Sequence, residues 1–294
     1  MRCVALLLLA VPLAAQGEGR QPVNPGTDTE QKLFAPAERE GFSFIVFGDR
    51  TGGPPDGLKI LEHAIRATNR LDPDLVMTVG DMVQGYNEAP QWIEQMREFK
   101  EVMKGLRAPW YPVAGNHDVY GRGKDKAKGH VGLYKKHFGP LYYSFDYKWA
   151  HFVALFSDEK LAFRNPAQTQ NMSAEQMEWL RKDLAATRAK QVYVFLHHPR
   201  WLYGGTNWPE VHKILKGDGR VQAVVAGHIH YFRDDGVHDG IHYWTLAVTG
   251  GNANVLKGPV ALQHFAHAKV RPDGFTMAIL PVGSVLGADI AKGR

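Results

Sequence analysis

Five short polar segments recur along the chain, each directly after an apolar run, and their side chains could hold metal ions. They supply carboxylate, amide and imidazole donors, which suit Mn²⁺, Fe or Zn²⁺ better than Ca²⁺ or Cu(I). The donors exceed the needs of one tetrahedral ion, so the set predicts two ions that share a carboxylate. Such a pair can hold a hydroxide nucleophile and neutralise phosphate oxygens during displacement at phosphorus. The segments are Gly48-Asp49-Arg50, Gly80-Asp81, Gly115-Asn116-His117-Asp118, His197-His198-Pro199 and Gly227-His228-Ile229-His230.

The elements that must position these segments are strands, because ligands of open α/β sheets bind at the carboxyl ends of the strands. Helical periodicity, by contrast, predicts helices at 56–69, 90–104, 173–188 and 209–215. This alternation predicts an α/β fold with mixed sheets, and no linker divides residues 41–294 into separate domains. Apolar runs predict strands at 42–47, 75–79, 110–113, 192–196, 221–225, 241–248 and 275–282, and a hairpin of 141–146 and 151–156.

The composition excludes several kinds of catalytic group and of binding partner. The 294 residues include 14 His but only one Cys, Cys3, so the rest of the chain has no thiol nucleophile, disulfide or Cys-ligated metal. The formal net charge of +5 is a mild excess that fits a small anionic substrate. Nucleic-acid binders usually concentrate their positive charge, and we expect no nucleic-acid-binding module here. The sequence leaves the oligomeric state open.

The first fifteen residues have the pattern of a secretory signal peptide. Arg2 precedes a run of Leu, Val and Ala, and small residues offer a cleavage site near Ala15-Gln16. The run is about half of the ~20 residues that a membrane-spanning helix needs, and no second long apolar stretch follows. We expect a signal peptide at 1–15, a flexible leader at 16–40, and an exported mature chain, periplasmic or extracellular, without a membrane span. The alternative is an uncleaved N-terminal anchor.

In their order, the five segments resemble the motifs of the calcineurin-like metallophosphoesterase superfamily, which includes purple acid phosphatases and class III cyclic-nucleotide phosphodiesterases. The resemblance covers about 42–251 and implies a four-layer α/β/β/α sandwich around a dinuclear metal centre. It implies that His117 faces the substrate and protonates the leaving oxygen or stabilises its charge, and that Asp118 orients His117 by accepting a hydrogen bond. It also implies the metal ligands: Asp49 and His230 for the first metal, Asp81 as the bridge, and Asn116, His197 and His228 for the second.

The chain departs from the family pattern at the first metal. Many members have Asp-x-His in the first motif, whereas this chain has Thr51 in the place of that His. Purple acid phosphatases also lack the His but place a Tyr three residues after the bridging Asp, where this chain has Gln84. Tyr86 lies two residues further on, and we do not expect it to substitute. Two alternatives follow: a weak, exchangeable first site, or a site that Thr51 or water completes so that catalysis survives.

Three more residues adjoin the metal-binding segments and could contact a phosphate. Arg50 and Arg200 carry planar guanidinium groups that match phosphate geometry, with a surface salt bridge as the alternative role. His198 either faces the substrate or is structural. The sequence therefore predicts a secreted, metal-dependent phosphoesterase acting on a small phosphate ester, and a phosphomonoesterase is preferred. The alternatives are a phosphodiesterase with the same site and a non-catalytic metal- or phosphate-binding relative weakened by Thr51.

Overall fold

The computed structural model describes residues 40–122, 129–159, 171–253 and 262–287. The signal peptide at 1–15 and all but the last residue of the leader at 16–40 lie outside the described residues, and both stay predictions. Among the described helices, none is both long enough and apolar enough to cross a membrane.

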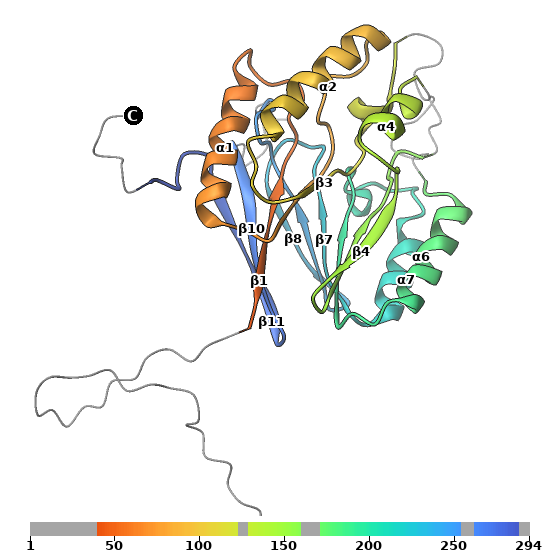
Figure 1. Ribbon diagram of the computed structural model, residues 1–294. Coiled ribbons are helices and arrows are strands. Elements are labelled where there is room, and N and C mark those ends of the chain that lie inside the picture. Colours follow the sequence, from red (N-terminus) through yellow and green to blue (C-terminus); the bar gives the residue numbers. More distant parts are fainter. Residues whose placement is uncertain (1–39, 123–128, 160–170, 254–261, 288–294) are drawn as a thin grey trace, which may run out of the picture. The chain divides into compact units, whose positions relative to one another are not determined.

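The first of two sheets carries β1 at its centre (Figure 1). Its strands, in spatial order, are β11 (Gly274–Pro281), β10 (His264–Arg271), β1 (Phe42–Phe47), β2 (Leu75–Thr78) and β3 (Trp110–Tyr111). β1, β2 and β3 run parallel, whereas β10 is antiparallel to both of its neighbours. The carboxyl ends of β1, β2 and β3 therefore meet at one edge of this sheet.

The second sheet has a parallel centre and antiparallel edges. β5, β6, β7 and β9 are parallel, and β4 and β8 pair antiparallel at the two sides. The predicted hairpin is present as β4 and β5. The strands, in spatial order, are β4 (Tyr143–Tyr147), β5 (Ala150–Ala154), β6 (Gln191–Phe195), β7 (Val221–Ala226), β9 (Ile241–Thr245) and β8 (Arg233–His238).

Apolar cores on both faces of each sheet create four layers. Alternation along β1 sends Phe44 and Val46 toward the second sheet, and Ile45 and Phe47 toward the helices on the outer face. A third core lies between the second sheet and the helices on its far side. The predicted α/β/β/α sandwich with mixed sheets is confirmed. The helices are α1 (Gly57–Leu71), α2 (Ala89–Met103), α3 (Asn116–Val119) and α4 (Val131–His137) on the first side, and α6 (Ala174–Ala186), η1 (Arg200–Leu202) and α7 (Trp208–Asp218) on the other.

Two strands, β10 and β8, are absent from the sequence prediction. β10 pairs with every residue of β1 and most of β10 is buried, yet His264, His267 and Lys269 interrupt its apolar pattern. β8 is polar because it lies at a sheet edge. The predicted strand 241–248 ends earlier, at Thr245, because the chain then crosses to the first sheet, where Val248 forms a bridge with Asp49.

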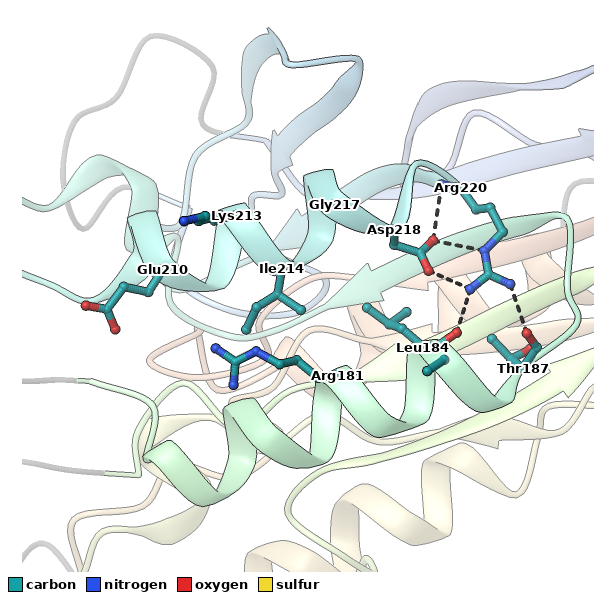
Figure 2. A pocket seen from close by; sticks show the side chains of 10 residues that line it. Arg181, Leu184, Thr187, Glu210, Lys213, Ile214, Gly217, Asp218 and Arg220 are labelled. Carbon is teal, nitrogen blue, oxygen red and sulfur yellow. Dashed lines mark hydrogen bonds and ion pairs between the residues drawn. The ribbon is translucent and has the colours of Figure 1, made fainter.

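A cavity of about 880 Å³ lies between α6 and α7 (Figure 2). Arg220 closes one end of it by donating to the backbone carbonyls of Leu184 and Thr187 at the carboxyl end of α6. The same guanidinium pairs with Asp218 at the end of α7. Arg220 thus satisfies exposed helix carbonyls and ties the two helices together. None of the predicted site residues lines this cavity.

Candidate metal centre

The six predicted metal ligands follow the carboxyl ends of strands, three from each sheet. The two sheets are joined at this edge by the segment after β9, where the amide of Gly48 donates to the hydroxyl of Thr249 over 2.9 Å. A second link is the amide of His228, which donates to Asp49 Oδ2 over 2.8 Å. The structure therefore brings together residues that are far apart in the sequence. Asp49, Asp81 and Asn116 follow β1, β2 and β3, His197 follows β6, and His228 and His230 follow β7.

Four donors converge in what we call the second half of the site: Asp81, Asn116, His197 and His228. Asn116 Oδ1 lies 2.9 Å from His197 Nε2 and 3.1 Å from His228 Nδ1, and these two nitrogens are 3.3 Å apart. Asp81 Oδ2 is 3.3 Å from His197 Nε2. His197 Nδ1 donates to the carbonyl of Val79 over 2.7 Å, so Nε2 is the ring nitrogen that faces the other donors.

Asp49, Asp81 and His230 form the first half of the site. His230 Nδ1 donates to the carbonyl of Asn252 over 2.8 Å, which leaves Nε2 to face Asp49 Oδ2 at 3.3 Å. Asp49 Oδ1 is buried and accepts no hydrogen bond from any described residue. Carboxylate and imidazole donors of Asp49, Asp81 and His197 lie within 4.8 Å of one another, so Asp81 is placed between the two halves.

Three of the converging ligands have unusual backbone conformations. Asp81, His228 and His230 have φ values of 56°, 73° and 60°, in the left-handed region that non-glycine residues rarely adopt. Two glycines allow the close approach of backbone to carboxylates: a Cβ at Gly115 would lie 2.3 Å from Asp81 Oδ1, and one at Gly227 would lie 2.2 Å from Asp49 Oδ1. Strain retained at one cluster is typical of a functional site.

The charge of the cluster fits cations. Burial lowers the pKa of His197, but the carboxylates of Asp81 and Asp49 outweigh it and raise the pKa to about 10, and the same two carboxylates would favour a metal cation in the place of that proton. Burial and the neighbouring His198 and His197 rings hold the pKa of His228 well below its usual value, which keeps its lone pair available. Facing lone pairs, two buried carboxylates and an unbonded Asp49 oxygen together match a pair of metal ions of the Mn, Fe or Zn type.

The hydroxyl of Thr51 is hydrogen-bonded to the backbone beside the first half of the site. It lies 2.9 Å from the carbonyl of Asp81 and 2.8 Å from that of Val83, and the side chain is buried. The single hydroxyl proton is engaged by these carbonyls, so Thr51 fastens the turn after β2. Thr51 therefore has a structural role, and completion of the first metal's coordination by Thr51 or by water stays a prediction.

His117 lies beside Asp81, but Asp118 does not orient it. The amide of His117 donates to Asp81 Oδ1 over 2.9 Å, and its Nδ1 contacts the backbone carbonyl of Gln84. Asp118 instead accepts hydrogen bonds from backbone amides at 2.8–3.2 Å, and burial raises its pKa to about 7. The predicted His117–Asp118 contact is wrong because the carboxylate turns away to hold the backbone of the ligand loops. The amides belong to Asp81, Met82, Val83 and Gly115.

The predicted substrate contact at Arg200 is also wrong. Its side chain is 2% exposed, donates to the carbonyl of Ser157 and lies 3.7 Å from Asp158. By contrast, Arg50 keeps two buried guanidinium nitrogens, Nε and Nη1, for which the described residues supply no hydrogen-bond partner. A phosphate contact by Arg50 stays a prediction.

His198 packs beside the second half of the site. Its ring centroid is 3.6 Å from that of His228, and its Nδ1 is 2.8 Å from Asp158 Oδ2. Asp158 also accepts from the hydroxyl of Tyr120 over 2.9 Å. Asp158 was not among the predicted site residues. It does share a signal with the ligands, since it closely follows the carboxyl end of β5 at the same sheet edge.

Comparisons with known proteins show the family and the fold. Residues 42–232 match the family model described as calcineurin-like phosphoesterase. Human tartrate-resistant acid phosphatase type 5 is 26% identical over 254 residues, which cover 72% of this chain and 75% of that protein. A dimetal phosphatase from Danio rerio superposes with a TM-score of 0.64 at 14% identity, covering 83% of this chain and 98% of that one. A purple acid phosphatase from yellow lupin gives a TM-score of 0.61 at 16% identity, covering 85% and 53%.

Proposed function

The chain belongs to the calcineurin-like phosphoesterase family, and on this basis we propose that it hydrolyses phosphate monoesters at a dinuclear metal centre. Membership makes it a metal-dependent phosphoester hydrolase, and the finer assignment is our proposal. The observation that carries it is the convergence of Asp81, Asn116, His197 and His228 on one point, with Asp49 and His230 beside them. The acid phosphatase relatives support a monoester over a diester.

The residues would divide between two ions, with Asp81 available to both. Asp49, Asp81 and His230 would hold the first, and Asp81, Asn116, His197 and His228 the second. When bound, such a pair activates water for attack on phosphorus and neutralises the charge on the phosphate oxygens. His197 and His230 are oriented for this task because each donates its other ring N–H to a backbone carbonyl.

His117 handles the proton of the leaving group. Its Nδ1 contacts the carbonyl of Gln84, which accepts only, so Nδ1 carries a proton and Nε2 is left for the substrate. As water forms the new P–O bond and the ester P–O bond breaks, His117, protonated on both ring nitrogens, donates its Nε2 proton to the departing oxygen, and the proton released by the attacking water restores it. The products are an alcohol and inorganic phosphate. Arg50 is the candidate contact for the doubly charged monoester.

A turnover assay tests the proposal. The purified mature chain, loaded in parallel with Mn²⁺, Zn²⁺ or Fe, is given chromogenic phosphate monoesters and diesters. We expect faster hydrolysis of monoesters and complete loss of activity after chelation. Preference for the diesters would establish the phosphodiesterase alternative. Absence of hydrolysis with every metal, in protein that metal analysis shows to be loaded, would refute the enzymatic role.

The non-catalytic alternative has one observation in its favour: the hydroxyl of Thr51 is engaged by two carbonyls, which leaves the first half with fewer donors than the second. Against it, the imidazole of His117 is held by the Gln84 carbonyl and the Tyr86 ring directly after the ligand Asn116, and metal binding alone does not need this imidazole. Metal titration combined with the turnover assay separates these functions, because a binding protein would take up metal and hydrolyse nothing.

Export remains part of the proposal. The apolar run after Arg2 and the small residues before Gln16 support cleavage near Ala15-Gln16. N-terminal sequencing of the protein recovered outside the cytoplasm is expected to begin at Gln16. Recovery of the uncleaved chain in the membrane fraction would instead support the N-terminal anchor.

A further inference from the structure

We propose that Tyr86 is a positioning residue of the centre: its hydroxyl sets the orientation of the Asn116 amide, and its ring supports His117. The sequence comparison with purple acid phosphatases points away from Tyr86, because it lies five residues after Asp81 rather than three. The structure gives it a different task, at the second half of the site. The inference rests on the proposed function, since both of its partners belong to that site.

The hydroxyl of Tyr86 accepts a hydrogen bond from Asn116 Nδ2 over 2.9 Å. An asparagine amide has a donor end and an acceptor end, and only the oxygen can bind a cation. With Nδ2 held by Tyr86, Oδ1 faces His197 Nε2 at 2.9 Å and His228 Nδ1 at 3.1 Å. Removing the hydroxyl would leave the amide free to rotate and to present its NH₂ group to the metal.

The ring of Tyr86 packs against His117. The two ring centroids are 4.5 Å apart and the planes lie at 86°, an edge-to-face contact. This contact complements the one between His117 Nδ1 and the carbonyl of Gln84, because the two restrain the imidazole from different directions. One side chain therefore reaches both a metal ligand and the proton donor.

The backbone around Tyr86 is shaped to deliver it there. Gly85 and Tyr86 both adopt left-handed conformations, with φ values of 61° and 52°. A Cβ at Gly85 would lie 2.0 Å from the carbonyl oxygen of His117, so the turn packs directly on the segment it supports. The amide of Tyr86 donates to the carbonyl of Tyr120 over 3.1 Å. A bulky residue held in an unfavourable conformation at this place is consistent with a functional requirement.

Two variants separate the two tasks. Tyr86→Phe keeps the ring and removes only the hydroxyl, whereas Tyr86→Leu removes the ring as well. Calorimetric titration with Mn²⁺ measures the affinity of each half of the site without any substrate. We expect Tyr86→Phe to weaken the tighter Mn²⁺ site by roughly 10–100-fold, the range for groups that orient metal ligands.

The second readout is the dependence of kcat on the leaving group at saturating Mn²⁺. A series of aryl phosphates is used, running from good to poor leaving groups. Because proton donation matters most for poor leaving groups, Tyr86→Leu should lose the most activity on those, whereas Tyr86→Phe should keep the wild-type dependence. A residue that only stabilises the fold would lower the melting temperature without changing this dependence.

The matched control is Tyr147→Phe. Its hydroxyl donates to Asp74 over 2.5 Å. Asp74 directly precedes β2, so this contact lies at the opposite end of the sheets from the ligands. We expect unchanged Mn²⁺ affinity. Wild-type Mn²⁺ affinity in Tyr86→Phe would overturn the role of the hydroxyl, and an unchanged leaving-group dependence in Tyr86→Leu would overturn the role of the ring. Wild-type protein that binds Mn²⁺ but hydrolyses no ester would refute the proposed function, while the calorimetric comparison would still decide the role of the hydroxyl.

Discussion

Asp81 is the residue on which both halves of the site depend. It is 1% exposed, its Oδ1 accepts from the amide of His117, and its Oδ2 lies 3.3 Å from His197 Nε2. Asp81→Asn keeps the shape but removes the charge shared by the two ions, so we expect activity to fall by roughly 100-fold or more, with little change in the unfolding of the metal-free protein. Activity assays, metal analysis and urea denaturation measure the three effects. The exposed Asp56→Asn is the control, and near-normal turnover by Asp81→Asn would refute a bridging role.

His117 should act on the rate rather than on metal content. Its ring contacts the Gln84 carbonyl and Tyr86, and its link to the metal centre is the backbone amide, which His117→Ala retains. We expect kcat to fall by roughly 10²–10⁴-fold, the usual contribution of a proton donor, while bound metal stays at the wild-type level. His63→Ala, on the exposed face of α1, is the control. A parallel loss of metal and rate would make His117 a ligand instead.

The sequence locates side chains near the site better than it predicts their orientation. Each ligand follows a strand, and this pattern is visible in the residues alone. The contacts of Asp118 and Arg200 were predicted incorrectly because adjacency in sequence does not fix where a side chain turns. Asp118 accepts hydrogen bonds from backbone amides, and Arg200 donates to a backbone carbonyl. Nearly every residue has these backbone groups, whatever its side chain, so the sequence does not indicate which of them a polar side chain will bind.

At the scale of elements, His151 fastens the β4–β5 hairpin to α6. Its Nδ1 lies 2.6 Å from Asp146 Oδ1 on β4, and its Nε2 lies 2.8 Å from Asp183 Oδ2 on α6. Burial lowers the pKa of His151, but the two carboxylates outweigh it and raise the pKa above its usual value. The charged ring therefore stabilises the fold fully below the unfolded pKa of about 6.5, and this stabilisation is lost as the pH rises through the folded pKa.

We expect His151→Gln to lower the free energy of unfolding by about 2 kcal/mol at pH 6, the scale of hydrogen bonds to a charged group. The deficit should shrink as the pH rises above the folded pKa of His151, where the wild-type ring is neutral. Urea denaturation of both proteins over a pH series gives the difference directly. His63→Gln, an exposed histidine on α1, should follow the wild-type curve. A deficit that is the same at every pH would show that His151 acts by packing alone.

The elements themselves were largely predictable, and of the two strands that were missed, the buried β10 is the more instructive. Strongly apolar strands such as β1 and β6, and helices with a clear apolar face such as α1, appear where their periodicity places them. β10 escaped because two buried histidines, His264 and His267, interrupt its apolar run. Its partner β1 lies more than 200 residues earlier in the chain, so its pairing leaves no local trace in the sequence.

At the scale of the whole molecule, the centre joins the two sheets. Asp49, Asp81 and Asn116 come from one sheet and His197, His228 and His230 from the other, so ions that bind this set bind the folded chain and not the unfolded one. Mass action then stabilises the fold by about 2.7 kcal/mol at a metal concentration of 100 Kd. For a domain of this size, that corresponds to a rise in melting temperature of roughly 5–10 °C.

We therefore expect a chelator to lower the melting temperature of the loaded protein by about this amount, and excess Mn²⁺ to restore it. Asp81→Asn should show a much smaller shift, because it weakens both ions at once, whereas Asp56→Asn should show the full shift. Calorimetric melting curves with parallel metal analysis make the comparison. If the melting temperature does not change with the chelator, in protein shown to lose its metal, the bound ions do not couple the two sheets. Hydrogen bonds such as the one from the His228 amide to Asp49 would then hold this edge together without metal.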